Sequence, residues 1–242
     1  MKIPSLRVRT HYHVTGHTLV INLEGRKRLL SSAPQGGGLR LASYVLNHQV
    51  EANPTSISSG AMSFRDPARS LRELAARLGI RAATVGLMTA VPMTQLVTAR
   101  AETDGLWVEC FATVGVTNAV RAGEWPLAVG AGERVDKPGT INLILITNGS
   151  LSQAAMVGAV QVVTEAKSSV LRDHDVSSCR SSAPATGTGT DAVVLACSLR
   201  GQGPFHLYSG THTMIGALLG QVVTDCVTRG LAKANAWQEL YR

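Results

Sequence analysis

The chain has 242 residues, of which 45% are apolar and only 16% charged, against roughly 25% charged residues in an average soluble protein. Its length lies in the range of single α/β domains, so we expect one domain over residues 1–242. The net charge of +7 comes from dispersed arginines, and aromatic residues make up 4% of the chain, which argues against a nucleic-acid-binding face. A chain this poor in charge has a largely neutral surface, which favours a homo-oligomer.

Neither export nor a membrane is indicated. The N-terminus lacks the apolar core of a signal peptide. Two long uncharged stretches, residues 138–164 and 203–224, contain too many polar and turn residues to cross a bilayer. The cysteines lie far apart without C-x-x-C spacing, which excludes a zinc site of that kind and a secreted disulfide scaffold: Cys110, Cys179, Cys197 and Cys226. We therefore expect reduced thiols and a cytoplasmic location.

The first third of the chain alternates between apolar and polar residues. This pattern predicts a β-meander with turns at Thr15-Gly16 and Glu24-Gly25. The strands are expected at residues 6–12, 18–23 and 28–32.

Two helices are predicted next. The spacing of Leu41, Ala42, Val45 and Leu46 favours the first, which ends before Asn53-Pro54. The second begins at the cap Asp66 with Pro67 as its first residue, and its apolar face continues to Leu78.

Strands and helices then interleave. Asn148-Gly149 forms a turn, and Ser150 with Gln153 has the spacing of a capping box that starts a helix ending near Leu171. A last helix runs from Thr213 to Arg229 and is ended by Gly230. Strands are expected at residues 82–90, 106–114, 141–147 and 192–197. The predicted fold is α/β (α+β): an N-terminal β-meander joined to a mixed sheet that about four helices cover.

The segment from Ala185 to Asp191 alternates glycine with Thr186, Thr188 and Thr190. Its exposed N–H donors and hydroxyls could bind an anion or a polarised carbonyl. It is no nucleotide-binding loop, because no G-K-[ST] follows and the next element is a strand. Composition alone favours an ordinary turn.

Other polar residues lie where strands end. Asn142 and Asn148 flank the buried strand 141–147, and Asn118 and Arg121 follow strand 106–114. Such amides often face a ligand at the end of a sheet, and a guanidinium pairs with phosphate or carboxylate. We predict that all four bind substrate, although capping alone accounts for Ser150 and Asn148.

Three titratable groups are candidates for chemistry. Glu165 interrupts an apolar helix, but its spacing from Gln161 and Ser169 also fits a solvated stripe. His212 precedes a helix, where a neutral imidazole acts as a base or merely caps. Metal is not expected either. Three histidines lie close together near the N-terminus, but they lack a carboxylate and a third close ligand: His11, His13 and His17.

Taken together, an ordered set of segments resembles the adenosylcobinamide amidohydrolases, the CbiZ-type family. The upstream part comprises residues 30–33, Gly37-Gly38, Asn47 and Ser59-Gly60-Ala61-Met62, and the rest comprises Val116–Gly123, Gly139–Asn142, Thr164–Lys167, Ala185–Asp191 and Gly210–Thr213. The likeness covers nearly the whole chain. One departure is Glu124, where the family pattern leads us to expect Asp.

The resemblance implies a hydrolase of corrinoid salvage. It would cut the amide between the corrin ring's propionate arm and an aminopropanol unit, releasing adenosylcobyric acid for rebuilding into coenzyme B12. The corrinoid is then the substrate, and no cofactor is expected. A corrinoid-binding protein without activity and a Thr- or Ser-dependent amidase acting on another substrate are the alternatives.

Amide hydrolysis needs an activated nucleophile, an oxyanion donor and an acid for the leaving amine. Our hypothesis is that His212 or Glu165 activates water or assists the amine, and that Asp191 orients a partner. Backbone N–H groups of residues 188–190 would stabilise the oxyanion. A covalent variant would use Thr190 or Ser150 as the nucleophile.

Overall fold

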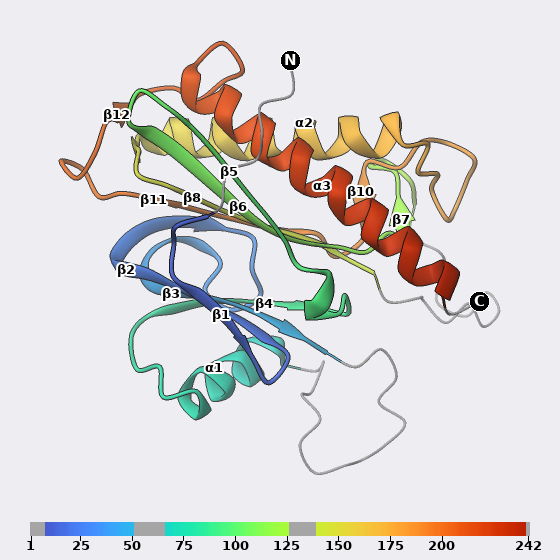
Figure 1. Ribbon diagram of the computed structural model, residues 1–242, viewed down its shortest axis with the longest axis horizontal. Coiled ribbons are helices and arrows are strands. Elements are labelled where there is room, and N and C mark those ends of the chain that lie inside the picture. Colours follow the sequence, from blue (N-terminus) through green and yellow to red (C-terminus); the bar gives the residue numbers. More distant parts are fainter. Residues whose placement is uncertain (1–7, 51–65, 126–138, 241–242) are drawn as a thin grey trace.

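The computed structural model describes residues 8–50, 66–125 and 139–240 (Figure 1). The strands are β1 (Tyr12–Thr15), β2 (Thr18–Ser31), β3 (Gly38–Gln49), β4 (Thr84–Thr89), β5 (Val97–Thr103), β6 (Leu106–Val114), β7 (Ala119–Val120), β8 (Ile141–Thr147), β9 (Ser150–Leu151), β10 (Gly187–Thr188), β11 (Ala192–Cys197) and β12 (Phe205–His206). The helices are α1 (Pro67–Arg77), the 3-10 turn η1 (Met93–Gln95), α2 (Gln153–Asp173) and α3 (Met214–Leu240).

Eight of the strands form one mixed sheet in the order β4-β3-β2-β11-β8-β6-β5, with β1 paired to β2. The sheet bends between β2 and β11, so that β3 and β4 lie over β6 and β8. The bend is evident from Asn47 in β3, which hydrogen-bonds Asn142 in β8 although two strands separate them in the sheet order. The molecule therefore has four layers, in the order helix, sheet, sheet and helix.

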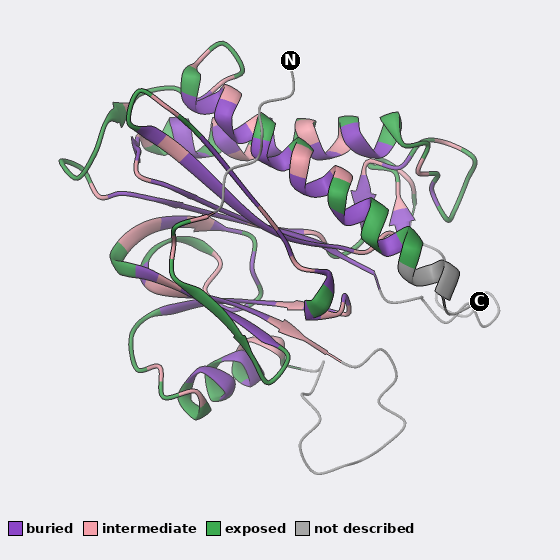
Figure 2. Cartoon of the chain, in the orientation of Figure 1, coloured by how far each residue is buried: buried purple, intermediate pink, exposed green. Residues whose placement is uncertain are grey.

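Two apolar layers hold these parts together (Figure 2). One cluster lies between the two halves of the sheet and includes Ile21, Val45, Phe111 and Ile144. The other joins β5, β6 and β8 to α2 and α3. In β8, alternate residues enter the two clusters, so both of its faces are buried, and the prediction of a buried strand at residues 141–147 is confirmed.

The predicted helix around Leu41 is wrong, because these residues belong to β3. This strand pairs with β2 on one side and β4 on the other. Val45 enters the cluster between the sheet halves, and Leu46 packs with Ala75 of α1 on the opposite face. Burial on both faces removes the alternation that marks a strand, and the remaining apolar spacing also fits a helix.

The predicted meander is only partly correct. Residues 18–23 and 28–31 lie on the single long strand β2, one residue short of the second predicted strand, and the expected turn is an irregularity between Asn22 and Lys27. Glu24 and Gly25 have φ values of 53° and 122° there, so the local backbone does turn, but pairing with β3 resumes. The expected strand at residues 6–12 falls partly outside the described residues. Strand β5 was not predicted at all.

The helices also differ in detail from the predictions. The described residues contain three α-helices rather than about four. Ser152, and not Ser150, caps α2 by accepting a hydrogen bond from Ala155 N at 2.9 Å. Helix α3 continues through Gly230 to Leu240. None of the helices in the described part of the chain is long and apolar enough to cross a membrane.

Gly230 lies inside α3 and does not end it. Since glycine has no side chain, the helix can approach the sheet closely at this position. A Cβ at this position would lie 2.5 Å from a methyl group of the buried Val114, whereas one at Gly220 would meet only Val162, at 3.9 Å. We expect Gly230→Ala to destabilise the fold by about 1–3 kcal/mol through overpacking. Gly220→Ala should stabilise it by up to about 1 kcal/mol, because alanine favours the helix. Urea unfolding of both variants checks the pair, and equal effects would contradict this account.

Candidate active site

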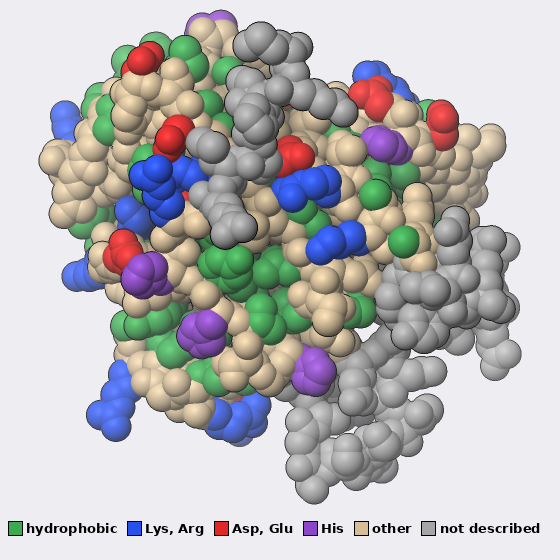
Figure 3. All heavy atoms as spheres, in the orientation of Figure 1, with side chains coloured by type: hydrophobic (Ala, Val, Ile, Leu, Met, Phe, Trp, Pro, Cys, Tyr) green, Lys and Arg blue, Asp and Glu red, His purple; other side chains and the backbone are tan. Residues whose placement is uncertain are grey.

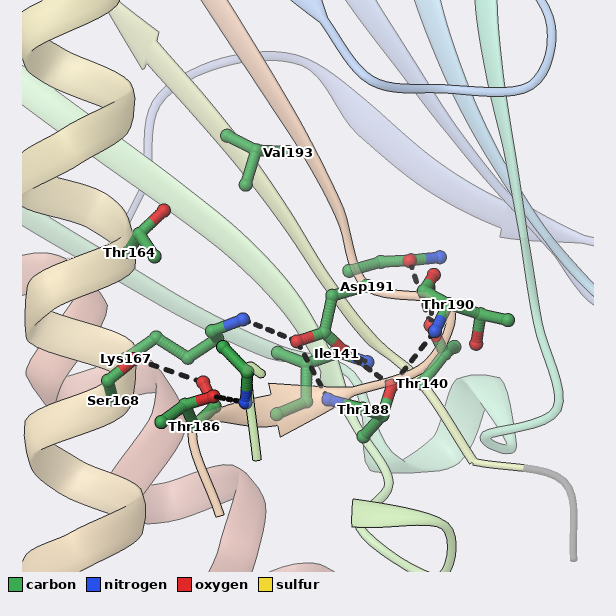
Figure 4. A network of polar contacts seen from close by, with 12 residues as sticks. Thr140, Ile141, Thr164, Lys167, Ser168, Thr186, Thr188, Thr190, Asp191 and Val193 are labelled. Carbon is green, nitrogen blue, oxygen red and sulfur yellow. Dashed lines mark hydrogen bonds and ion pairs between the residues drawn. The ribbon is translucent and has the colours of Figure 1, made fainter. Parts of the chain in front are cut away.

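Polar groups from distant segments meet around Asp191, immediately before β11 (Figure 4). Its Oδ1 accepts hydrogen bonds from Ile141 N at 2.9 Å and from the Thr188 hydroxyl at 2.5 Å. Its Oδ2 accepts from Thr188 N at 3.1 Å and from the Lys167 ammonium group. One carboxylate thereby joins β8, β10 and α2.

Lys167 is the member of this group that the sequence analysis missed. Its side chain is 10% exposed and that of Asp191 is 14% exposed, so the two charges form a largely buried ion pair. A signal was present in the sequence, because Val163, Val170 and Leu171 lie four residues before and three and four residues after Lys167. All three are buried, which places the lysine on the core-facing side of α2.

The Gly/Thr segment is more than an ordinary turn. Gly187 and Thr188 form β10, which pairs with β7. The Thr186 hydroxyl accepts from Ala122 N at 2.9 Å, and its carbonyl accepts from the Ser168 hydroxyl at 3.0 Å. A Cβ at position 187 would lie 2.7 Å from the Lys167 Nζ atom, so the lysine reaches Asp191 only across a glycine.

The tip of this segment is open. Gly189 and Thr190 are exposed, and a Cβ at Gly189 would meet no atom within 4 Å. Of the backbone N–H groups expected to stabilise an oxyanion, that of Thr188 already donates to Asp191, and that of Thr190 lies 3.5 Å from the Thr188 hydroxyl. The third of these groups, the N–H of Gly189, has no acceptor among the described residues.

A buried amide network continues from the tip into the space between the sheet halves. The Thr140 hydroxyl donates to Thr190 O at 2.9 Å and lies 3.4 Å from Asn142 Oδ1. Asn142 Nδ2 donates to Asn47 Oδ1 at 2.9 Å, and Asn47 Nδ2 donates to the Thr113 hydroxyl at 3.1 Å. Asn142 is 1% exposed, so its amide is committed to holding the layers together and reaches a ligand only indirectly.

Asn118 and Arg121 flank β7, which pairs with β10 of the Gly/Thr segment. The Oδ1 atom of Asn118 is buried, and the described residues offer it no hydrogen-bond partner. It would lie 2.5 Å from a Cβ at Gly139, next to Thr140. The Arg121 guanidinium donates to Pro184 O at 3.2 Å and is otherwise exposed at the rim.

Asn148 lies at the opposite end of β8. Its side chain accepts from Trp107 N at 2.9 Å and donates to Gly105 O at 2.7 Å, which fastens the β5–β6 hairpin. Strand β8 has seven residues and separates Asn148 from Asn142 by about 20 Å, at about 3.3 Å per residue. Ser150 lies at that far end too, fully buried.

His212 is also distant from Asp191. It is exposed and precedes α3, near Ser209, whose hydroxyl donates to Ala155 O at the start of α2. From Ala155 to Lys167 the helix rises about 18 Å, at 1.5 Å per residue. The structure therefore does not bring His212 to the Asp191 carboxylate.

Glu165 faces a different space from Lys167, because residues two apart on a helix point in nearly opposite directions. It lines a groove of about 1000 Å³ between α2 and α3, together with Thr211 and Gln221. Among the described residues, no three His, Cys, Asp or Glu side chains gather as metal ligands would.

Glu124 holds the loop next to the Gly/Thr segment. Its carboxylate accepts from the hydroxyls of Ser178 at 2.6 Å and Ser181 at 2.5 Å, and from Arg121 N at 3.0 Å. The Ser178 and Ser181 hydrogen bonds, followed by the one from Arg121 N, lower the pKa of Glu124 to about 2. The glutamate found in place of the expected aspartate thus has a structural task in this chain.

Residues 3–239 match the model of a protein family described as CbiZ, adenosylcobinamide amidohydrolase. The chain belongs to this family. It is 31% identical to an adenosylcobinamide amidohydrolase of Methanosarcina mazei, with 91% of this chain and 96% of that protein covered. It is 29% identical to an uncharacterized protein, MJ1613, of Methanocaldococcus jannaschii, with 90% and 87% covered.

The solved structures that resemble the chain are more distant. An l-aminopeptidase d-Ala-esterase/amidase of Ochrobactrum anthropi has 10% identity and a TM-score of 0.41, with 90% of this chain and 77% of that chain covered. A β-aminopeptidase of Burkholderia sp. has 11% identity and a TM-score of 0.38, with 93% and 82% covered. It is family membership that identifies the protein as an enzyme that hydrolyses amide bonds.

The buried ion pair makes a prediction about stability. Lys167→Met leaves the Asp191 carboxylate buried without its counter-charge, which should cost about 3–5 kcal/mol of unfolding free energy. Asp191→Asn added to Lys167→Met removes both charges and should recover part of the loss. Chemical denaturation of the single and double variants measures this coupling. Additive losses in the double variant would contradict a direct pair.

The low pKa of Glu124 makes a prediction about pH. Because this pKa is lower in the folded chain than in the unfolded one, the stabilisation is present above the unfolded value of about 4.5 and disappears as the pH falls toward 2. Glu124→Gln should therefore lower Tm at pH 7 and make no difference near pH 2. Thermal unfolding of both proteins across this range is the measurement, and a Tm difference independent of pH would refute it.

Proposed function

We propose that the protein hydrolyses adenosylcobinamide at the amide between the corrin propionate arm and aminopropanol. The products would be adenosylcobyric acid, which can be rebuilt into coenzyme B12, and the free amino alcohol. Family membership over residues 3–239 and the printed name of the Methanosarcina mazei relative support this reaction. The corrinoid is the substrate, and the proposal requires no resident cofactor.

One structural observation supports placing the chemistry at Asp191. Segments that carry the family resemblance lie far apart in the sequence, yet hydrogen bonds join them around this carboxylate: residues 116–123, 139–142, 164–167 and 185–191. Asn47 joins them through Asn142. Such convergence of polar groups at strand ends is typical of ligand sites in α/β proteins.

The groups at this end match the needs of amide hydrolysis. Hydroxyls and a carboxylate lie beside the exposed residue Gly189, whose N–H can stabilise a developing oxyanion. The predicted substrate contacts are divided by depth: Thr190 and Arg121 lie at the surface, while Thr186, Thr188, Asn118 and Asn142 lie deeper. Asn148 is outside this group, and its contact with substrate stays a prediction.

The catalytic roles of Glu165 and His212 also stay predictions. Neither residue adjoins Asp191, so each would need to act from the α2–α3 groove or from the start of α3. Glu165→Gln and His212→Ala test them directly, since loss of turnover by a folded variant would assign the residue to the reaction.

Incubation with adenosylcobinamide tests the proposed function. We expect adenosylcobyric acid and 1-amino-2-propanol in equal amounts by liquid chromatography and mass spectrometry. Asp191→Asn should lower kcat at least about 100-fold, because it removes the charge at the centre of the site. Asp173→Asn, an equivalent change on the exposed end of α2, should leave kcat unchanged.

The same measurement separates the alternatives. Tight binding of intact corrinoid would indicate a binding protein without activity. Hydrolysis of simple amides with indifference to the corrin ring would indicate an amidase for another substrate. Either result would overturn the proposed reaction.

A further inference from the structure

Thr188, Asp191 and Lys167 form a continuous line of hydrogen bonds. The Thr188 hydroxyl donates to Asp191 Oδ1 at 2.5 Å, and the Lys167 ammonium donates to Asp191 Oδ2. A hydroxyl bound to a base that a third group orients is the arrangement that activates serine and threonine nucleophiles. We propose that Thr188 is the nucleophile of a covalent mechanism, with Asp191 as its base and Lys167 as a positioning residue. This inference rests on the proposed function.

The hydroxyls of Thr140, Thr186 and Thr190 have no carboxylate partner among the described residues. Those of Thr140 and Thr190 donate to backbone carbonyls, Thr190 O at 2.9 Å and Gly139 O at 3.2 Å. The Thr186 oxygen accepts from Ala122 N. A carbonyl oxygen does not take a proton at neutral pH, so these contacts orient the hydroxyls without activating them. Ser150, the other nucleophile considered from the sequence, lies at the far end of β8.

The residue after Thr188 supplies the second requirement. In many hydrolases, the N–H of the residue that follows the nucleophile points at the developing oxyanion. Gly189 follows Thr188, is exposed and has open space where a side chain would be. Its N–H has no acceptor among the described residues, so in this scheme it receives the developing oxyanion.

The step balances without an added reagent. The Thr188 oxygen bonds to the amide carbon while its proton passes to Asp191, and the C–N bond then breaks as that proton passes to the leaving amine. This leaves the corrin propionate as an ester on Thr188. Water attacks the ester carbon and gives one proton to Asp191, which returns it to the Thr188 oxygen as the ester bond breaks. The product is a free carboxylic acid.

Lys167 explains how Asp191 can serve as a base in a largely buried place. The ammonium compensates the charge of a carboxylate that is only 14% exposed. It also fixes Oδ2, so that Oδ1 is directed at Thr188. Lys167 does not itself touch the reacting atoms in this scheme.

The experiment uses the whole chain and a probe that does not depend on corrinoid recognition. p-Nitrophenyl acetate is added, the reaction is quenched with acid, and peptide mass spectrometry locates the acetyl group. We expect acetylation of Thr188 in the wild-type protein, and at least about 100-fold slower acetylation in Asp191→Asn. Circular dichroism and Tm confirm that each protein is folded.

Corrinoid turnover provides the second readout. Thr188→Val should lower kcat for adenosylcobinamide at least about 1000-fold, whereas Thr188→Ser, which keeps the hydroxyl, should stay within about tenfold of wild type. Thr164→Val is the matched control and should leave kcat unchanged. The Thr164 hydroxyl donates to Val160 O of its own helix, and Figure 4 shows no contact between Thr164 and the residues bonded to Asp191.

The possible failures are distinguishable. Acetylation that misses Thr188 in the wild-type protein, or a folded Thr188→Val variant with turnover near wild type, overturns the nucleophile. Acetylation of Thr188 without any hydrolysis of adenosylcobinamide supports the nucleophile and overturns the proposed reaction instead. An active Thr188→Ser with an inactive Thr188→Val shows that the hydroxyl is needed, and acetylation located at Thr188 separates a nucleophile from a hydroxyl that only holds Asp191.

Discussion

The contact between Lys167 and Asp191 is the constraint on which this end of the molecule depends. Two opposite charges, each largely removed from water, must stay together because either alone is costly to bury. The pair fixes α2 against the loop, while the other oxygen of Asp191 holds Ile141 at the start of β8. Asp191 also holds Thr188 of β10, which pairs with β7. This pairing positions the rim at residues 118–124.

The bent sheet explains why polar groups can gather here without weakening the core. Along β8, leucines and isoleucines fill the two apolar clusters. The one side-chain amide in this strand belongs to its second residue, Asn142. That amide reaches Asn47 across the space between the sheet halves, so the polar groups satisfy one another at the end of the apolar layer. On the molecular face in Figure 3, the charged side chains are scattered, and apolar side chains are exposed between them.

The sequence predicted elements well where a single periodicity applied. Helix α1, with its Asp66 cap, and strands β6, β8 and β11 were correct to within one or two residues. It failed at β3, because the spacing of Leu41, Ala42, Val45 and Leu46 also fits a helix, and at Gly230, where contact with Val114 outweighs the tendency of glycine to end a helix. The Gly/Thr segment was predicted as part of the site. The helical spacing of Lys167 could have placed it on the core-facing side of α2, but its contact with Asp191, like that of Thr140 with Thr190, is a tertiary contact that no local pattern records.

Linear motifs divide in space, and this decides which residues can share a reaction. Thr164, Glu165 and Lys167 are neighbours in one motif, yet Thr164 bonds within its helix, Glu165 faces the α2–α3 groove and Lys167 faces Asp191. A helix turns about 100° per residue, so adjacent motif positions are directed to separate surroundings. The order of the motifs was sufficient to indicate the family, whereas the chemistry of each residue follows from the face of the element that carries it. By that criterion Thr188, rather than the more exposed Thr190, has the environment of a nucleophile.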